Sequence, residues 1–240
     1  MFKNLEQRAV ELELMDKFPS GGAELRKAYR QLRLLNRIFG AAGPTRYGVE
    51  RLWTEAKEPK QLTIVDIGSG SGDVNRQLLR WAAKRGIQLQ LILADVTEEA
   101  CSEAERLYHD EHRVKVIQCN LFDLPAGCAD IVTGTQFVHH FSADELPAVV
   151  VQMVNCSRLG VVINDIHRHR IAWAAVWLMT RIMSDNRYIR NDGPLSVAKG
   201  FRSSDWDELG RQLGIAGPFY RWRPLFRYAV TIRKMELSGW

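Results

Sequence analysis

Residues 62–73 read Leu-Thr-Ile-Val-Asp-Ile-Gly-Ser-Gly-Ser-Gly-Asp and predict a buried strand that runs directly into a glycine-rich turn. Gly68, Gly70 and Gly72 alternate, and glycine lets the backbone adopt positive φ and approach a ligand with no Cβ atom in between. A helix is expected to open at Asp73, and its first N–H groups would face whatever occupies the turn. This order of strand, glycine turn and helix is typical of a nucleotide site in an open α/β sheet.

Length and composition fit one substantial α/β domain. The chain has 240 residues, of which 46% are hydrophobic and 25% charged, as in ordinary globular proteins. The four cysteines form no C-x-x-C pair, so neither a zinc site nor a disulfide framework is predicted, and a reduced, cytoplasmic compartment fits best. The N-terminus is too polar for a signal peptide, and the most apolar run, residues 171–179, is about half the length of a membrane span. The net charge of +5 permits an anionic partner without requiring one.

Helices are expected before the first strand. Residues 3–15 mix apolar and charged side chains, and a break follows at 19–22. Apolar residues at helical spacing then run from Leu25 to Phe39, followed by a loop at Gly43-Pro44 and a short helix through Trp53. The opposite face of the second helix carries four arginines, which either form a solvated face, the favoured reading, or meet RNA or a phosphopantetheine carrier: Arg26, Arg30, Arg33 and Arg37.

From residue 62 onward strands and helices alternate, which predicts an α/β fold with a doubly wound, seven-stranded, mostly parallel sheet. A helix opened by the capping box Ser142-x-x-Glu145 precedes the fifth strand. The pattern then changes to a Trp-rich helix at 168–184, an irregular loop through Asp192-Gly193-Pro194 and a helix at 204–214. The expected strands are 62–67, 89–94, 114–118, 129–134, 160–166, 219–223 and 226–233. We expect residues 1–58 to form a helical N-terminal cap and 59–240 the core, with a cap insertion at about 167–202.

The glycine spacing narrows the choice of nucleotide. Gly68-x-Gly70-x-Gly72 has its last glycine one position earlier than the dinucleotide fingerprint. Asp66 lies two residues before the first glycine, where a carboxylate would repel a pyrophosphate but favour a cofactor with a sulfonium and an α-ammonium group. Asp95, at the end of the second strand, is placed to accept both ribose hydroxyls.

These motifs resemble those of the class I S-adenosylmethionine-dependent methyltransferases over about residues 60–235. Residues 65–72 look like the first motif of that superfamily, and 120–125 look like its adenine-side segment, with Cys119-Asn120 in place of the usual Gly-Asp. Residues 130–141 are similar to the fourth-strand motif with its following Leu-His-His. The closing hairpin, 219–233, also matches the superfamily.

A closer resemblance is to bacterial small-molecule methyltransferases found beside type III polyketide synthases. It rests on Glu13-Leu14-Met15-Asp16, on 34–40, and on 192–196 followed by Phe201 and Trp206. The resemblance implies a Rossmann-like methyltransferase fold and the transfer of a methyl group from S-adenosylmethionine to a small acceptor. The expected acceptor is a hydroxyl of a phenolic or polyketide-derived metabolite, as in secondary metabolism, although N- or C-methylation stays open.

Residues near the glycine turn, the strand ends and the N-terminal addition are expected to bind this cofactor. Arg46 and Tyr47 are included because such positions often clasp the cofactor carboxylate in methyltransferases with helical N-terminal additions, an ordinary turn being the alternative. The full set is Asp66, Gly68, Ser69, Gly70, Gly72, Asp95, Val96, Asn120, Leu121, Thr135, Arg46 and Tyr47.

Methyl transfer from a sulfonium needs a positioned acceptor, exclusion of water and removal of one proton. Histidine suits the last task because its ordinary pKa is near neutral. The catalytic candidates are His139 and His140 after the fourth strand and His167 after the fifth. One of the first two is expected to be structural, and His167 and His169 fit a solvated turn as readily as a site. No third ligand accompanies this His-x-His pair, so no metal is predicted. Trp173 fits either packing or a lid over the acceptor.

Other functions remain open. The chain has no added RNA-binding module and no Asn-Pro-Pro-Tyr-like tetrapeptide after the fourth strand, which disfavours a methyltransferase acting on RNA or protein. The glycine spacing and Asp66 disfavour a nicotinamide-dependent oxidoreductase. A fourth option is a fold that binds the cofactor but only scaffolds a partner. The expected partner is a small molecule rather than a nucleic acid, and the expected assembly is a monomer or homodimer.

Overall fold

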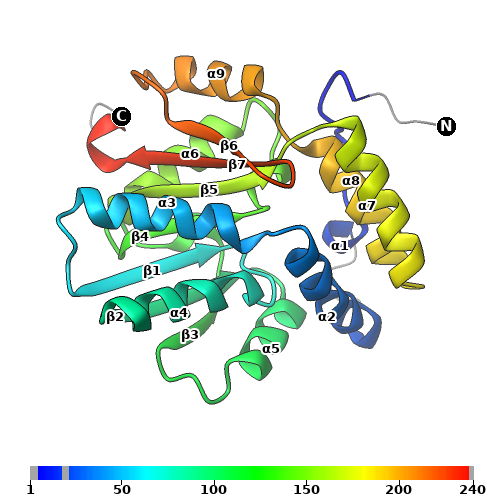
Figure 1. Ribbon diagram of the computed structural model, residues 1–240, viewed down its shortest axis with the longest axis horizontal. Coiled ribbons are helices and arrows are strands. Elements are labelled where there is room, and N and C mark those ends of the chain that lie inside the picture. Colours follow the sequence, from blue (N-terminus) through cyan, green and yellow to red (C-terminus); the bar gives the residue numbers. More distant parts are fainter. Residues whose placement is uncertain (1–4, 18–21, 238–240) are drawn as a thin grey trace.

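A seven-stranded sheet forms the centre of the molecule, which a computed structural model describes over residues 5–17 and 22–237. Its strand order is β3-β2-β1-β4-β5-β7-β6 (Figure 1). The first five strands run parallel, whereas β7 is antiparallel to both β5 and β6. The expected doubly wound, mostly parallel sheet is therefore confirmed. The strands are β1 (Gln61–Ile67), β2 (Gln88–Asp95), β3 (Val114–Gln118), β4 (Ala129–Thr135), β5 (Ser157–Ile166), β6 (Tyr220–Arg223) and β7 (Arg227–Arg233).

Helices cover both faces of this sheet because its central strands are apolar on both sides. In β1, Ile64 packs into the cluster that includes Trp53 and Leu78, and Val65 packs into the one that includes Met153 and Trp206. The helices that pack on the sheet are α3 (Ala42–Glu55), α4 (Arg76–Arg85), α5 (Glu98–Leu107), α6 (Leu146–Cys156) and α9 (Ser203–Gln212). Four 3₁₀ turns are η1 (Asp73–Asn75), η2 (Leu121–Asp123), η3 (Val138–His140) and η4 (Lys234–Leu237).

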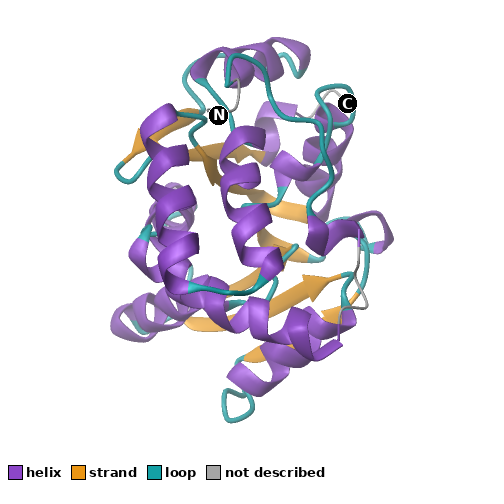
Figure 2. Ribbon diagram, turned by 90° about the vertical axis from the view of Figure 1, so that its right-hand side faces the viewer, coloured by secondary structure: helices purple, strands orange, loops and turns teal. Residues whose placement is uncertain are grey.

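A second layer of helices lies over the carboxyl ends of the parallel strands (Figures 1 and 2). It consists of α1 (Leu14–Lys17), α2 (Gly22–Ile38), α7 (Arg170–Met183) and α8 (Arg187–Lys199). Leu25 and Tyr29 of α2 share an apolar cluster with Tyr188 and Ile189 of α8. Segments far apart in the sequence thus close one end of the sheet together. Helix α3 instead packs along β5 and β7, so the helices before β1 do not act as one unit.

The expected helix at residues 3–15 is wrong within the described range, because residues 5–13 are not helical. Their backbone bonds to distant partners instead of to itself. Ala9 N donates to the carbonyl of Ala198 at 3.0 Å, and the buried Arg168 donates to the carbonyl of Leu5 at 3.1 Å. Residues 5–17, which we call the N-terminal strap, therefore cross the cap layer. The break predicted at 19–22 lies largely outside the described residues.

The expected loop through Asp192-Gly193-Pro194 is also wrong, because α8 runs through all three residues. A Cβ atom on Gly193 would lie 2.8 Å from Thr180 of α7, so the glycine allows close contact between the two helices. That packing stabilises a helix that Gly and Pro would otherwise disfavour. Gly43 and Pro44 likewise lie in the first turn of α3 rather than in a loop, a position that proline tolerates.

The basic stripe of α2 is partly used inside the molecule. Arg30 and Arg33 lie 3.0 and 3.9 Å from the carboxylate of Glu103 in α5, whose side chain is fully buried. These ion pairs join α2 to α5, so two of the four arginines serve packing between helices. Within the described residues, none of the helices combines the length and apolarity needed to cross a lipid bilayer.

Candidate active site

The glycine turn after β1 has the geometry that the sequence predicts. Gly68, Gly70 and Gly72 have φ of 60°, 55° and 70°, a region that side chains with a Cβ atom rarely adopt. A Cβ on Gly68 would also lie 2.3 Å from Phe137. The turn is pinned from the neighbouring strand, since Ser69 N donates to the carbonyl of Ala94 at 3.2 Å. The backbone is therefore held open to the cavity above it.

Asp66 lies beneath the turn rather than in the cavity. Its carboxylate is buried and accepts hydrogen bonds of 2.6 Å from Asn75 Nδ2 and from Thr133 Oγ1. Burial raises the pKa of Asp66 to about 6, with these two bonds lowering it in part. The side chain joins β1, β4 and η1, so the predicted direct contact with a cationic cofactor is wrong. It supports the turn instead.

Asp95 occupies the expected place at the end of β2. Its two carboxylate oxygens accept from Gly70 N at 2.8 Å and from Thr97 N at 2.9 Å. Burial raises the pKa of Asp95, and the same two backbone bonds oppose this shift. The side chain of Thr97 is a third hydrogen-bond partner of this carboxylate, so of its roughly four acceptor sites about one stays open to another donor. Asp95 therefore links the glycine turn to the cavity.

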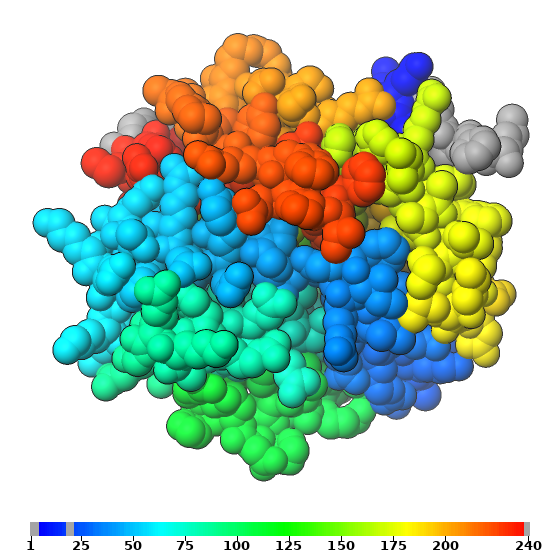
Figure 3. Space-filling view, viewed as in Figure 1, coloured from blue at the N-terminus to red at the C-terminus, as the bar shows by residue number. Residues whose placement is uncertain are grey.

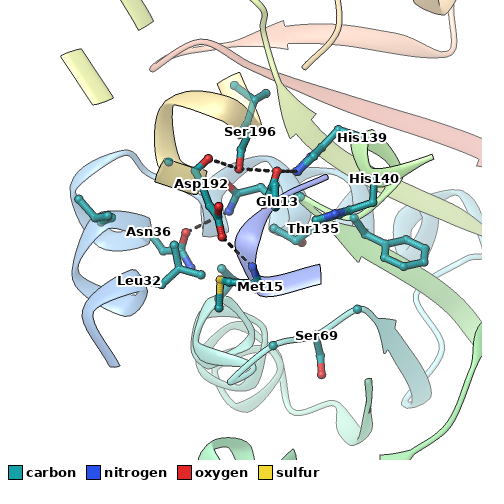
Figure 4. A pocket seen from close by; sticks show the side chains of 18 of the residues that line it. Glu13, Met15, Leu32, Asn36, Ser69, Thr135, His139, His140, Asp192 and Ser196 are labelled. Atoms are coloured by element: carbon teal, nitrogen blue, oxygen red, sulfur yellow. Dashed lines mark hydrogen bonds and ion pairs between the residues drawn. The ribbon is translucent and has the colours of Figure 1, made fainter. Parts of the chain in front are cut away.

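A cavity of about 530 Å³ lies above these strand ends, between the sheet and the cap layer. Such a volume is in the range of small-molecule sites. It extends from the glycine turn to the N-terminal strap, α7 and α8 (Figure 4). Of the residues predicted to bind a cofactor, eight line it: Gly68, Ser69, Gly70, Asp95, Val96, Asn120, Leu121 and Thr135. Gly72 does not line the cavity. The side chain of Leu93 lies against it, where a Cβ atom would be only 2.4 Å away.

His139 lies at the far end of this cavity between two carboxylates. Its Nδ1 is 2.8 Å from Asp165 Oδ1, and its Nε2 is 3.4 Å from Glu13 Oε1. Burial alone would lower the pKa of His139, but the charges and hydrogen bonds of Asp165 and Glu13 raise it to about 9. The imidazole is therefore protonated at neutral pH, and both of its nitrogens face acceptors. This is the arrangement of a fixed cation rather than a base.

His140 differs from its neighbour in having one carboxylate partner and a partly exposed ring. Its Nδ1 lies 2.9 Å from Asp16 Oδ2. Burial raises the pKa of Asp16, but the hydrogen bond and charge of His140, with the charge of Lys199, outweigh this effect and leave the pKa below its usual value. An ionised Asp16 accepts a hydrogen bond from Nδ1–H of His140, which leaves the Nε2 lone pair of the ring to act as a base.

Polar side chains from the strap and α8 complete this end of the cavity. Ser196 Oγ donates to Glu13 Oε1 at 2.9 Å, and the carboxylate of Asp192 accepts from the backbone N–H of Leu14 and Met15 at 2.8 and 3.0 Å (Figure 4). The Nζ of buried Lys199 lies 3.9 Å from both Glu13 and Asp16. Negatively and positively charged groups therefore alternate around the two histidines.

Among the described residues, one group of acidic and histidine side chains comes close enough to share a metal ion, namely Glu13, His139 and His140. The two imidazoles are stacked, with centroids 4.4 Å apart and 28° between their planes. Nearly parallel rings do not direct their in-plane lone pairs to one point, and Lys199 already supplies a positive charge beside Glu13. The trio thus fits an ion-pair network better than a metal centre, and the predicted lack of a metal stays a prediction.

Three predicted site residues lie away from the cavity. His167 contacts Trp222, whose Nε1 donates to His167 Nδ1 at 3.2 Å, and it is not part of the lining. Arg46 and Tyr47 lie on α3 instead of a loop, with Arg46 exposed and the Tyr47 ring covered by Arg223 at 4.3 Å. Their expected roles at the site are therefore wrong. Trp173 of α7 packs against the buried cluster of Ile166, Ala172 and Val197 and is not part of the cavity lining.

Several lining residues had no chemical role in the sequence interpretation. Their only signal was that all five fall in the short patterns behind the closer family resemblance, which carry no chemistry by themselves. Asn36, for example, donates to Asp73 at 3.2 Å and accepts from Gln136 at 3.0 Å, next to the glycine turn. These residues are Glu13, Asp16, Asn36, Asp192 and Ser196.

Residues 64–160 match the family described as a methyltransferase domain. Among curated proteins, the ubiquinone/menaquinone biosynthesis C-methyltransferase UbiE of Rickettsia typhi is 35% identical over 85 residues, which cover 32% of this chain and 34% of that protein. The corresponding protein of Rickettsia prowazekii is 34% identical over the same shares. The chain thus spans about a third of the length of the curated relatives it matches.

Solved structures resemble the chain over most of its length. The plantazolicin methyltransferase BpumL, in complex with S-adenosylhomocysteine, has a TM-score of 0.62 at 14% identity and covers 87% of this chain and 77% of its own. Magnesium protoporphyrin IX methyltransferase of Synechocystis PCC 6803 has a TM-score of 0.58 at 13% identity and covers 92% and 97%. A methyltransferase of Aquifex aeolicus has a TM-score of 0.57 at 15% identity and covers 87% and 97%. At these identities the likeness establishes the fold.

Proposed function

Because the chain carries a methyltransferase domain with the class I fold, we propose that it transfers a methyl group from S-adenosylmethionine to a small, largely apolar acceptor, with a phenolic or polyketide-derived hydroxyl as the preferred target. One observation carries the proposal. A single cavity joins the glycine turn and Asp95 at one end to the paired Asp16 and His140 at the other.

The donor end supports this assignment. Asp95 lines the cavity at the end of β2, where its carboxylate would accept from the ribose, and the glycine turn leaves space for the amino acid part of the cofactor. Val96 and Phe122, both largely exposed, line the cavity together with Asn120 and would flank the adenine. Asn120 uses Oδ1 to accept from Phe122 N at 3.1 Å, so its Nδ2 remains as a donor.

At the acceptor end, we assign His140 as the base and His139 as a structural cation. The acceptor O–H gives its proton to His140 Nε2 while its oxygen attacks the methyl carbon of the donor. The carbon–sulfur bond breaks, and its electron pair remains on sulfur, which becomes the neutral thioether of S-adenosylhomocysteine. Asp16 holds the imidazole by Nδ1 and balances the charge that it gains. The apolar walls from α2 and α7 exclude water.

A titration and a turnover assay test the two halves separately. Isothermal titration calorimetry should show micromolar binding of S-adenosylhomocysteine and no response to NADH. Incubation with a panel of phenols should form S-adenosylhomocysteine, and His140→Gln should reduce turnover by 10²-fold or more with cofactor affinity unchanged. The matched control is His109→Gln, a solvated histidine. Turnover on bulk RNA or protein without turnover on any phenol would refute the small-molecule assignment.

Methylation at carbon is a second candidate, because the curated relatives are named C-methyltransferases. When His140 removes the proton of a phenol hydroxyl, the resulting phenolate is nucleophilic at its ring carbons as well as at its oxygen. Both reactions can use the same base and cavity. Carbon NMR of a product made with ¹³C-labelled donor distinguishes an aryl methyl from a methoxy group.

A further inference from the structure

Helix α7 is strongly apolar yet little of it is buried. Its sequence is Arg-Ile-Ala-Trp-Ala-Ala-Val-Trp-Leu-Met-Thr-Arg-Ile-Met, and only Ala172 and Thr180 are fully buried. A helix on the surface of a globular domain usually turns polar residues to solvent. Exposed apolar surface of this extent marks a site of interaction. Helix α7 lies at the edge of the molecule, on the right in Figures 1 and 3.

The exposed side of α7 is a stripe of large aliphatic residues. Ile171, Leu178 and Ile182 are 62%, 51% and 69% exposed. They are spaced at i, i+7 and i+11, so at about 100° per residue they project within roughly 40° of one another. We call these three residues the α7 stripe. It is too regular along the helix to be scattered surface hydrophobicity.

The charged residues of α7 itself have one sign. Arg170 and Arg181 are exposed and lie on the same flank of the helix, and α7 contains no acidic residue. Arg181 also stacks over the ring of Trp177 at 4.0 Å. An apolar stripe bordered by arginines and a tryptophan has the composition of helices that lie in the interface of a bilayer.

An adjacent side of α7 lines the cavity. Ala172, Ala175 and Val176 line it and, at about 100° per residue, project on average about a quarter turn away from the α7 stripe. Leu225, also part of the lining, is half exposed, and the next residue, Phe226, packs with Val176 against the same buried cluster. Apolar surface therefore continues from solvent, around the helix, to the acceptor end of the cavity.

We propose that the α7 stripe docks on the surface of an anionic lipid bilayer. Ile171, Leu178 and Ile182 would enter the acyl boundary, while Arg170 and Arg181 would pair with anionic headgroups. A second copy of the chain fits less well, because a two-fold contact through this face would bring the same arginines together without any acid from the helix. As an extension that rests on the proposed function, the acceptor is amphipathic and reaches the cavity from the bilayer.

Sedimentation with vesicles tests docking without reference to catalysis. The full chain should bind vesicles of phosphatidylglycerol and phosphatidylcholine, and should bind pure phosphatidylcholine at least about tenfold more weakly. The triple variant Ile171→Ser, Leu178→Ser, Ile182→Ser should lose at least about tenfold in affinity for the anionic vesicles. Met235→Ser is the matched control, because it removes a side chain of similar exposure on η4. Circular dichroism and binding of S-adenosylhomocysteine check that each variant folds.

Three outcomes would overturn the docking proposal. These are no sedimentation of the folded chain with anionic vesicles, equal sedimentation of the triple variant, or a dimer in light scattering that the triple substitution dissolves. A different result would show that the proposed methyltransferase function is wrong. In that case the chain would still bind vesicles but would not bind S-adenosylhomocysteine. If both hold, vesicles should raise turnover of an alkylated phenol but leave that of a short-chain phenol unchanged. Equal stimulation of both would refute delivery of the acceptor from the bilayer.

Discussion

The two ends of the cavity are built in different ways. At the donor end, the glycine turn and Asp95 lie within 28 residues of sequence on two neighbouring parallel strands, and most of their contacts are to backbone. At the acceptor end, side chains of the strap, η3, β5 and α8 meet in one network; the bond between Ser196 and Glu13 spans 183 residues. The first end depends on local geometry and the second on the complete fold.

This difference indicates where each end is vulnerable. The donor end is organised by backbone groups and positive φ, so a side-chain substitution there should affect binding more than folding. The acceptor end buries several charges that neutralise one another, and removing one of them leaves another buried and unpaired. Mutations at the acceptor end should therefore affect stability first.

Asp165→Ala should cause the largest change, a loss of folding stability. Asp165 is fully buried and bonds to Nδ1 of His139. Burial lowers the pKa of Arg227 to about 10 even though the charge of Asp165 opposes this shift. Loss of its charge leaves Arg227 without this compensation and His139 with Glu13 as its remaining carboxylate, and the free energy of unfolding should fall by about 3–5 kcal/mol. Urea denaturation measures this change. Asp185→Ala, at a solvated carboxylate paired with Lys27, should change it by less than about 0.5 kcal/mol; similar losses in both variants would contradict the contrast between the two ends.

The same contrast decides what the sequence could predict. The seven strands and the glycine turn were predictable because period, caps and glycine spacing are local signals. The strap and the helix through Asp192-Gly193-Pro194 were not, since contacts with Arg168, Ala198 and Thr180 determine their conformations. His139 and His140 were identified by their place after β4. Their difference in role comes from Glu13, Asp16 and Asp165, whose proximity no spacing reveals.

The stability of the acceptor end should also depend on pH through His139. Its pKa in the folded chain, about 9, lies above the ordinary value of 6.5. The stabilisation is therefore complete below about pH 6.5 and is lost as pH rises through about 9, a loss of about 3 kcal/mol. Unfolding free energies measured in urea at pH 6, 7.5 and 9 test this. In His139→Gln the slope over this window should flatten, and a wild-type curve without slope would show that the imidazole is neutral.

At the donor end, Asp95→Ala should weaken binding of S-adenosylhomocysteine by about 1–3 kcal/mol through lost charged hydrogen bonds. The carboxylate also holds Gly70 N and Thr97 N, so the turn loses part of its support as well. Asp95→Asn keeps one oxygen acceptor, so its affinity for S-adenosylhomocysteine should lie between that of the wild type and that of Asp95→Ala. Calorimetry measures the affinities, and urea denaturation checks stability. If Asp95→Ala unfolds the chain while Asp165→Ala leaves it stable, the proposed difference between the ends is reversed.

Arg46→Ala should have the smallest effect on cofactor binding. The variant tests whether Arg46 binds the cofactor carboxylate, as the sequence suggested, or only projects from α3, as in the structure. Arg46 projects from α3 into solvent outside the cavity lining, so its removal should change affinity for S-adenosylhomocysteine by less than about 0.5 kcal/mol, or roughly twofold. Calorimetry at low ionic strength makes the test stricter, because any long-range attraction between the guanidinium and the cofactor carboxylate is then least screened. A tenfold loss would mean that α3 approaches the cofactor when it binds, and the donor end would then depend on distant segments as the acceptor end does.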